Sequence, residues 1–246
     1  MKKFIVIFIL FIGAQQIGAQ GIFTKKRLMN RENHDKQRYR WGYYLGYNTL
    51  DFKIDYVRER ARIDGLGNPI TPDKQNIITQ KAGGFNVGLI GNLRINDFVD
   101  LRTEPGVIFN TRQLIFPNLP DERDQMREVK TTAVHIPLLV KISTKRLNNF
   151  KPFIVGGFST SINLSSNEDN PDDNEVGQFR MKTTYYNYEL GFGIDFYLPY
   201  FKFTPSIRGV FSMTDELVPD RDENSRFTSQ IDQLRTRGVF VNFTFQ

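Results

Sequence analysis

The amino-acid sequence predicts an all-β fold, namely an eight-stranded antiparallel up-and-down transmembrane β-barrel with short periplasmic turns and long extracellular loops. Three observations predict it. Large apolar residues recur with a period of two along eight segments, these segments are long, and the connections between them alternate between short and long. Strands of soluble proteins average about 5–6 residues, whereas a tilted strand needs about 9–11 residues to cross a bilayer. The segment lengths therefore favour a barrel that spans a membrane.

The alternation is clearest in residues 181–198. From Tyr186 to Leu198 every second residue is a large apolar one, and the residues between them are mostly small or charged, among them Glu189 and Asp195. Such a strand has one apolar face and one polar face, because successive side chains point to opposite sides. The eight segments with this pattern are roughly 41–55, 82–95, 98–112, 129–144, 150–164, 181–198, 200–214 and 235–246.

The connections support the same architecture. Three of them are short, at 96–97, at 146–148 and at Pro199. The other four are long and polar, and they cover roughly 56–81, 113–128, 165–180 and 215–234. Short and long connections in strict alternation are typical of outer-membrane barrels, whose turns face the periplasm and whose loops face outward. The strands of a soluble lipocalin or sandwich also alternate in hydrophobicity, but nothing in those folds requires short and long connections to alternate throughout.

Charged residues on the polar face of the strands predict a charged lumen. The core of a soluble sandwich would bear a heavy desolvation cost for them, whereas a barrel lumen lets them pair while the apolar face meets lipid. The charges concerned are Asp100, Arg102, Glu104, Glu189 and Asp195, with Arg94, Lys141 and Arg208 as expected partners. An eight-stranded barrel encloses little more than its own side chains, so a pore is not expected.

Several residues predict local features of the barrel. Aromatic residues near the periplasmic ends of the strands are expected to form an interfacial girdle: Trp41, Tyr43, Tyr197 and Tyr200. Prolines remove ladder hydrogen bonds, so bulges or strand ends are expected at Pro105, Pro137, Pro152 and Pro205. Paired glycines at 83–84 and 156–157 suit tight barrel curvature. The apolar parity of the first strand inverts near Thr49, and the weak alternation in 150–164 leaves the facing of that strand open.

The N-terminus predicts export. Lys2 and Lys3 precede an apolar run over residues 4–12 and a small residue at Ala19, which are the parts of a secretory signal peptide over residues 1–19. A retained anchor is the alternative, but the apolar run is short for a bilayer span. Residues 20–40 are rich in basic side chains and have no apolar period, so they are expected to form a solvated periplasmic segment. Residues 41–246 are expected to form the outer-membrane β-barrel domain, located in the cell outer membrane.

Composition excludes several classes of protein. The chain of 246 residues has no cysteine, which removes disulfides, thiolate nucleophiles and cysteine-ligated metals. Its mean hydropathy of −0.41 excludes a polytopic helical membrane protein. We expect no cofactor, no metal, no catalytic residue and no nucleic-acid partner; the expected surroundings are outer-membrane lipid.

Two motifs have residues that chemistry could use, and each also has a simpler interpretation. The acidic run from Glu168 to Glu175 is similar to a calcium loop but lacks the glycine and the glutamate spacing of an EF-hand, which favours a solvated extracellular loop. His135 could serve with a serine and an acid in a barrel-borne acyl hydrolase or acyltransferase. Its inward direction in the middle of a strand favours a hydrogen-bonded lumen residue instead.

Four motifs resemble known proteins, two of them at the level of a superfamily and two at the level of one family within it. His135–Lys141 (HIPLLVK) and 151–157 (KPFIVGG) resemble paired strands of the porin-like outer-membrane barrels of the Bacteroidota. Residues 102–106 (RTEPG) and the ending 237–245 (RGVFVNFTF) are similar to the PorT family within that superfamily. The resemblance covers roughly residues 40–246 and implies a component of the type IX secretion system, which exports adhesins, gliding-motility proteins and proteases. Gln246 departs from barrels that end on an aromatic residue.

Two classes of function therefore compete. The resemblance implies a non-enzymatic accessory barrel that helps to assemble or operate type IX protein secretion. The alternative is a general small outer-membrane barrel for adhesion or transport unrelated to secretion, with a lipid-modifying enzyme as a third interpretation. The long acidic loops suit either class.

Overall fold

The computed structural model describes residues 29–57, 62–63, 69–70, 77–117, 125–171, 179–221, 225 and 227–246. The predicted signal peptide (1–19), residues 20–28 and parts of the four long connections lie outside the described residues. None of the helices in the described ranges has the length and apolar character that a transmembrane helix requires.

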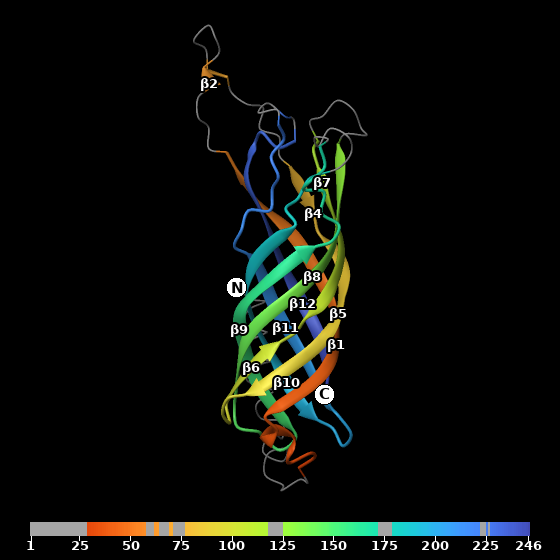
Figure 1. Cartoon of the computed structure of the whole chain (residues 1–246), viewed down its shortest axis with the longest axis vertical. Coiled ribbons are helices and arrows are strands. Elements are labelled where there is room, and N and C mark those ends of the chain that lie inside the picture. The colour runs from red at the N-terminus through yellow and green to blue at the C-terminus, as the bar shows by residue number, and fades with distance from the viewer. Residues whose placement is uncertain are drawn as a thin grey trace, which may run out of the picture.

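Nine strands make up the wall of the barrel, and two of them are halves of one predicted segment (Figure 1). They are β1 (Tyr39–Tyr56), β5 (Ala82–Arg94), β6 (Val99–Thr103), β7 (Gly106–Ile115), β8 (Met126–Ser143), β9 (Phe150–Asn163), β10 (Thr184–Tyr197), β11 (Lys202–Ser212) and β12 (Ile231–Phe245). Neighbouring strands pair antiparallel, with β6 and β7 each between β5 and β8, and β1 pairs with both β5 and β12, which closes the sheet. The prediction of an eight-stranded antiparallel barrel is confirmed, since β6 and β7 together occupy the third position.

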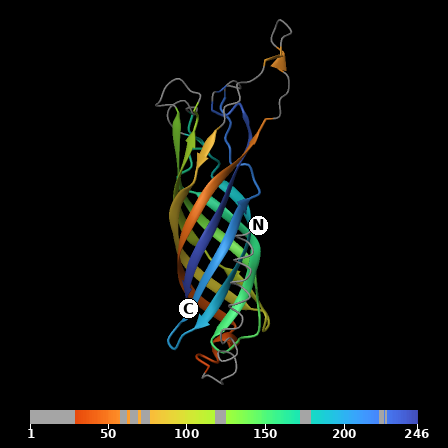
Figure 2. The same cartoon turned by 180° about the vertical axis from the view of Figure 1, so that it is seen from behind.

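Four shorter elements lie outside the membrane-spanning wall. β2 (Arg62–Ile63) pairs with β3 (Pro69–Ile70), and β4 (Ile78–Gln80) extends the sheet beside β7. The 3-10 helix η1 (His34–Lys36) precedes β1. Figures 1 and 2 show the short turns and η1 at one end of the barrel and the long connections at the other. We name these the turn end and the loop end.

The four prolines have different consequences. Pro105 and Glu104 separate β6 from β7, and the Leu89 N–H donates to the Pro105 carbonyl at 2.9 Å, so the predicted irregularity is confirmed there. At Pro205 the pairing of β11 with β10 is interrupted between Gly193↔Ser206 and Phe196↔Phe203.

The prediction is wrong for Pro137 and Pro152, which lie within a continuous register between β8, β9 and β10. The pairs Thr103↔Leu138 and Gly106↔His135 place Pro137 opposite Glu104, in the gap between β6 and β7. The N–H that proline lacks is therefore missing where the neighbouring strand is already broken.

The outer face of the wall is apolar, as the parity predicts. Leu89, Phe158 and Leu190 are each more than 60% exposed along the middle of the barrel. Trp41, Tyr43 and Tyr200 are exposed near the turn end, where an aromatic girdle is expected. Tyr197 does not belong to the girdle, because it has the inward parity of β10 and is only 1% exposed.

The apparent phase change near Thr49 is not a change of facing. Tyr44, Asn48, Leu50 and Phe52 all point inward and all are buried, so the inward parity of β1 continues past Thr49. What changes is the content of the interior, from polar to apolar. In the strand of uncertain facing, β9, the odd-numbered residues such as Lys151 and Val155 point inward.

The paired glycines have unequal roles. Gly84 and Gly157 have the inward parity, and a β-carbon on either would approach a backbone carbonyl oxygen of the next strand to 2.0 Å or 2.2 Å. Only glycine fits these two positions of close backbone approach. Gly156 points outward and a β-carbon there meets only ordinary contacts at 3.4 Å, so packing does not require glycine at that position.

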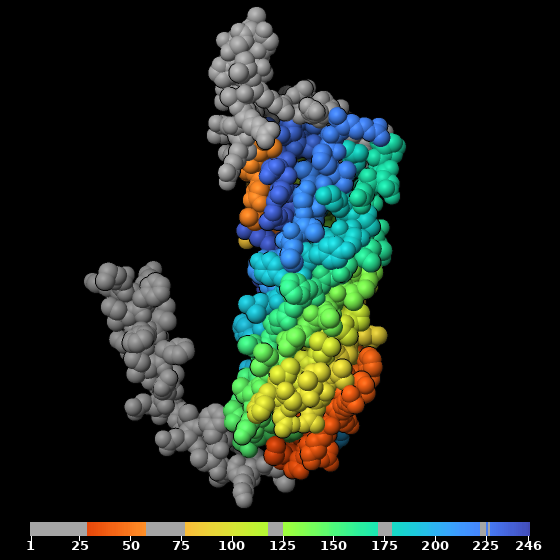
Figure 3. Space-filling model, turned by 60° about the vertical axis from the view of Figure 1, so that its left-hand side comes forward, coloured from red at the N-terminus to blue at the C-terminus, as the bar shows by residue number. Residues whose placement is uncertain are grey.

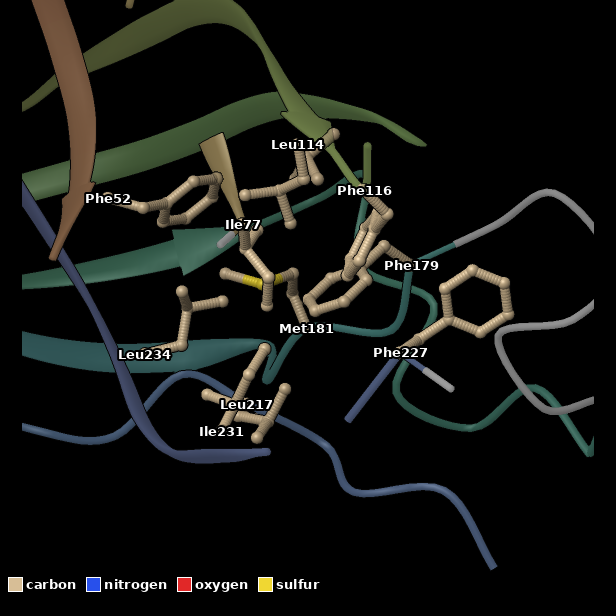
Figure 4. Packing of buried hydrophobic residues seen from close by; sticks show 11 residues of the cluster. Phe52, Ile77, Leu114, Phe116, Phe179, Met181, Leu217, Phe227, Ile231 and Leu234 are labelled. Carbon is tan, nitrogen blue, oxygen red and sulfur yellow. The ribbon is translucent and has the colours of Figure 1, made fainter. Parts of the chain in front are cut away.

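An apolar cluster closes the interior at the loop end (Figure 4). It draws side chains from β1, β7, β8 and β12 and from the described parts of the long connections. Its buried members are Phe52, Ile77, Leu114, Phe116, Val129, Phe179, Met181, Leu217, Phe227, Ile231 and Leu234. Phe116 and Phe227 meet edge to face with ring centroids 5.3 Å apart. We call this group the apolar cap.

Candidate functional site: a closed, charged lumen

The middle of the lumen is organised by one arginine. Arg208 on β11 pairs through Nη1 with Glu104 Oε2 at 3.0 Å and through Nε with Glu189 Oε2 at 2.8 Å. Arg102 also pairs with Glu104. All four side chains are at most 4% exposed. Every buried charge in this group therefore has an opposite charge in contact, as the parity of these residues predicts.

His135 joins this group and lies between a serine and a carboxylate, but with its two ring nitrogens in the opposite order to a catalytic triad, where Nε2 faces the serine. Its Nδ1 lies 2.9 Å from Ser161 Oγ, and its Nε2 lies 2.8 Å from Glu189 Oε1. Ser161 was not identified from the sequence, because β9 alternates too weakly to show which of its hydroxyls face inward. All three side chains are at most 2% exposed. A nucleophile must reach its substrate, and this serine lies inside a filled lumen, so the geometry favours a hydrogen-bonded lumen histidine.

A layer of buried amides lies on the loop-end side of this group. Asn86 Nδ2 donates to Asn242 Oδ1 at 2.8 Å, and Asn110 Nδ2 donates to Asn48 Oδ1 at 2.9 Å. The sequence analysis assigns no function to these uncharged residues, although their position in the alternating pattern indicates that they face the lumen. Each bond joins two strands that flank a third one, β5 with β12 and β7 with β1.

A second charged group lies at the turn end. Asp195 Oδ2 is 2.6 Å from Lys141 Nζ and 3.9 Å from Lys202 Nζ, and its Oδ1 accepts from Thr204 Oγ1 at 2.7 Å. Asp100 pairs with Arg40 Nη2 at 2.6 Å.

The predicted pairing of Lys141 with lumen carboxylates is confirmed, but that of Arg94 is wrong. Arg94 pairs with Asp97 inside the β5–β6 turn, where both side chains reach water. It lies at the last position of β5, beyond the closed part of the lumen.

The segment before β1 closes the turn end. Asp35 accepts hydrogen bonds from the Tyr197 hydroxyl at 2.7 Å and 2.8 Å to its two oxygens. Asn30 Nδ2 donates to the Tyr197 carbonyl at 3.0 Å, and Arg31 Nη1 donates to the Gln246 carbonyl at 2.8 Å. We call residues 29–38 the turn-end plug: most of them are exposed to solvent, as expected for this segment, but His34 is buried, and Asn30, Arg31 and Asp35 contact the barrel. The sequence lacks an apolar period here because the plug is held by polar contacts.

Electrostatics at the plug depend on two titratable groups. Burial lowers the pKa of His34 to about 4, and the nearby charges of Lys202, Arg31 and Arg40 act in the same direction. Burial alone would raise the pKa of Asp35. The hydrogen bond from Tyr197 and the charges of Lys151, Lys202 and Arg40 together hold it below its ordinary value. At neutral pH the plug therefore contains a neutral imidazole and a carboxylate.

The loop end is closed by one more polar group beneath the apolar cap. Arg112 donates to Thr236 Oγ1 at 2.8 Å and to Thr131 Oγ1 at 3.0 Å, and its guanidinium lies 3.7 Å from the centroid of the Phe52 ring. Glu216 accepts from the Thr236 hydroxyl at 2.7 Å. The lumen is thus filled from the turn-end plug to the apolar cap by side chains that are almost fully buried.

The acidic run is only partly within the described residues. Glu168 accepts the Thr183 N–H at 2.7 Å, whereas residues 172–178 lie outside them. Over the parts of the chain that the structure describes, no three acidic or histidine side chains gather in a way that would hold a metal ion.

A family model agrees with this architecture. Residues 19–218 match a family model described as "Outer membrane protein beta-barrel domain". Comparison with curated proteins gave no match. Among solved structures, the chain is similar to OprG from Pseudomonas aeruginosa, with 10% identity, coverage of 83% of this chain and 94% of that one, and a TM-score of 0.42.

Two further similarities are of the same kind. For Neisserial surface protein A the identity is 12%, the coverage 82% of this chain and 95% of that one, and the TM-score 0.36. For Ail of Yersinia pestis, in complex with the heparin analogue sucrose octasulfate, the identity is 12%, the coverage 85% and 99%, and the TM-score 0.37.

Proposed function

The chain belongs to the outer membrane protein beta-barrel domain family, and we propose that this outer-membrane barrel is a non-conducting, non-enzymatic accessory component of type IX protein secretion. The observation that carries the proposal is the filled lumen. A barrel whose interior is occupied at every level has no path for a solute, so its function lies on its surfaces: the loops, the turn end and the outer face. An accessory role in a membrane assembly uses such surfaces.

The choice of secretion over other surface functions is supported by the resemblance of residues 102–106 and 237–245 to the PorT family. In this chain the first of these motifs contains Arg102 and Glu104, which pair with each other in the lumen, and its Glu104 and Pro105 separate β6 from β7. The proposal implies contacts with other secretion proteins in the outer membrane or the periplasm. A general adhesion or transport barrel would not require such contacts.

A conductance measurement tests the first half of the proposal. Purified protein inserted in planar bilayers is expected to give no stable ion-conducting state, because charged and aromatic side chains fill the lumen. A porin inserted in the same bilayers serves as the positive control. Stable single-channel steps from the wild-type protein would contradict the filled-lumen interpretation and favour small-molecule transport.

A deletion strain tests the second half. We expect loss of the gene to block export of cargo that carries the C-terminal type IX signal and to leave unprocessed precursors in the periplasm. Complementation with the wild-type gene is expected to restore export, and unchanged levels of unrelated outer-membrane proteins exclude a general assembly defect. Normal cargo export with altered attachment or permeability would contradict the secretion role and favour the alternative.

A further inference from the structure

Two hollows adjoin on the outer surface of the barrel near the turn end. The larger, of about 500 Å³, is lined by Lys36, Arg38, Leu93, Arg94, Ile95 and Asn96. The smaller, of about 220 Å³, shares Leu93 with the first and continues along the outer face between Trp41, Leu101 and Leu138. Figure 3 shows this side of the molecule, where yellow strand residues lie between the orange-red N-terminal residues and green residues of β8.

The smaller hollow is apolar and lies beside an outward position that has no side chain. The outward positions of β5 are Phe85, Val87, Leu89, Gly91 and Leu93, so a glycine interrupts a row of large residues. A β-carbon at Gly91 would lie 3.0 Å from the Trp41 ring and 3.4 Å from the Thr103 methyl group. The Trp41 ring, which is 73% exposed, therefore lies against Gly91 and buries it, and the groove continues beside this ring toward Leu101 and Leu138.

The larger hollow is cationic. Among the described residues, Arg94 is paired with Asp97, whereas neither Lys36 nor Arg38 has a carboxylate partner. The backbone holds these groups together, because the Arg94 N–H donates to the Arg38 carbonyl at 2.9 Å and Arg94 Nη1 donates to the Lys36 carbonyl at 3.4 Å. The cluster has three cations and one anion.

The position of the two hollows determines which ligand they fit. Tyr39, Trp41 and Tyr43 are exposed beside them and mark the level of the membrane interface. A cationic hollow at that level with an apolar groove running into the bilayer is complementary to a lipid that has an anionic headgroup. Basic pockets at the membrane surface select anionic headgroups in this way.

We propose that these hollows bind one anionic phospholipid of the turn-end leaflet. Its phosphate lies among Lys36, Arg38 and Arg94, and one acyl chain lies in the groove beside Trp41. This site does not depend on the secretion role, because it follows from the outer surface of the barrel alone. It would tie the turn-end plug, which contains Lys36 and Arg38, to the lipid composition of the membrane.

The single tryptophan of the chain reports on the groove directly. The protein is reconstituted in phosphatidylcholine vesicles that contain a small fraction of lipid with brominated acyl chains, which quench nearby tryptophan. Brominated phosphatidylglycerol is compared with brominated phosphatidylcholine at equal fraction. A basic side chain near the surface favours an anionic lipid by roughly fivefold. We therefore expect clearly stronger quenching of Trp41 by the anionic lipid at low salt.

Paired variants distinguish a site from a general effect. The double variant Lys36→Gln/Arg38→Gln is expected to abolish the preference for phosphatidylglycerol, whereas Lys145→Gln, an exposed cation of the β8–β9 turn, is expected to keep it. Gly91→Leu fills the groove and is expected to reduce quenching by the anionic lipid to the level of the neutral one. Gly156→Leu, at an outward position with room for a side chain, is the matched control.

Heat-modifiable migration on gels verifies that each variant is folded. Equal quenching by the two lipids in the wild-type protein would overturn the proposal. It would also be overturned by a preference that survives Lys36→Gln/Arg38→Gln, or by a Gly91→Leu variant that behaves like Gly156→Leu.

Discussion

The membrane-spanning part of the barrel and its loop-end extension, which on β1 begins beyond Thr49, are built from the same strands. Their apolar side chains lie on opposite faces of the wall. In the membrane part the interior holds Glu189, Arg208 and their partners, and the exterior holds exposed side chains such as Leu190. Beyond Thr49 the interior becomes the apolar cap, and the outward positions of β1 become Asp51, Lys53 and Asp55. The facing of the strands does not change. The difference teaches that apolar side chains occupy the face from which water is absent. Within the membrane this is the outer, lipid-facing side of the wall, and beyond the membrane it is the interior of the barrel.

The largest expected effect comes from leaving buried lumen charges without a partner. Arg208→Met removes the cation that lies between Glu104 and Glu189. We expect the free energy of unfolding to fall by about 3–5 kcal/mol, because two carboxylates remain in the interior with fewer opposite charges. Urea titration in lipid vesicles, followed by the gel shift of the folded form, measures it. A change below about 1 kcal/mol would show that the lumen is wetter than its burial indicates.

The apolar cap should respond as a soluble core does. Leu234 is fully buried, so Leu234→Ala is expected to lower stability by about 2–5 kcal/mol through lost burial and the cavity left behind. Leu190→Ala, on the lipid face of β10, is the matched variant and is expected to cost only about 0.5 kcal/mol. Equal losses of stability in the same urea titration would contradict the stated difference between the apolar cap and the lipid-facing wall.

The turn-end plug should loosen in mild acid. The pKa of His34 is about 4 when the plug is docked and its ordinary value is 6.5, so the undocked plug binds a proton more readily. Docking is therefore fully stable above pH 6.5 and weakens as the pH falls toward 4. Asp35, whose pKa is lowered, weakens docking further only at still lower pH.

Hydrogen exchange measures this effect. Protection factors for the amides of His34, Lys36 and Gln37, corrected for the intrinsic pH dependence, are expected to fall over that range while those of the barrel strands stay constant. His34→Gln should remove the pH dependence above pH 4. A constant protection factor in the wild-type protein would mean that the plug is held without His34.

The smallest effect is expected at the outer surface of the loop-end extension. Lys53 and Asp55 form a pair at 3.2 Å with both side chains substantially exposed. Lys53→Ala is expected to change the free energy of unfolding by less than about 0.5 kcal/mol, since water and salt already screen this pair. A loss comparable to that of Arg208→Met would show that polar contacts at the loop-end surface matter as much as those of the lumen.

The sequence by itself determined the membrane-spanning segments, the facing of most of them and the charged character of the lumen, whereas the weak alternation of β9 left its facing open. Alternation with a period of two is a local property, because each side chain of a strand points opposite to the next. It therefore identified Glu189, Asp195, Lys141 and Arg208 as inward-facing without knowledge of their neighbours. The alternation of short and long connections likewise follows from the order of residues alone.

Only the tertiary structure decided which inward residues meet. The Ser161–His135–Glu189 group joins three strands, and its members are 26 and 28 residues apart along the chain. The docking of Asp35 against Tyr197, separated by 162 residues, has no periodic signal, because hydrogen bonds and ion pairs depend on single atoms. Closure of the barrel brings such atoms together, and burial there makes each pairing strong enough to hold the plug and the lumen in one arrangement.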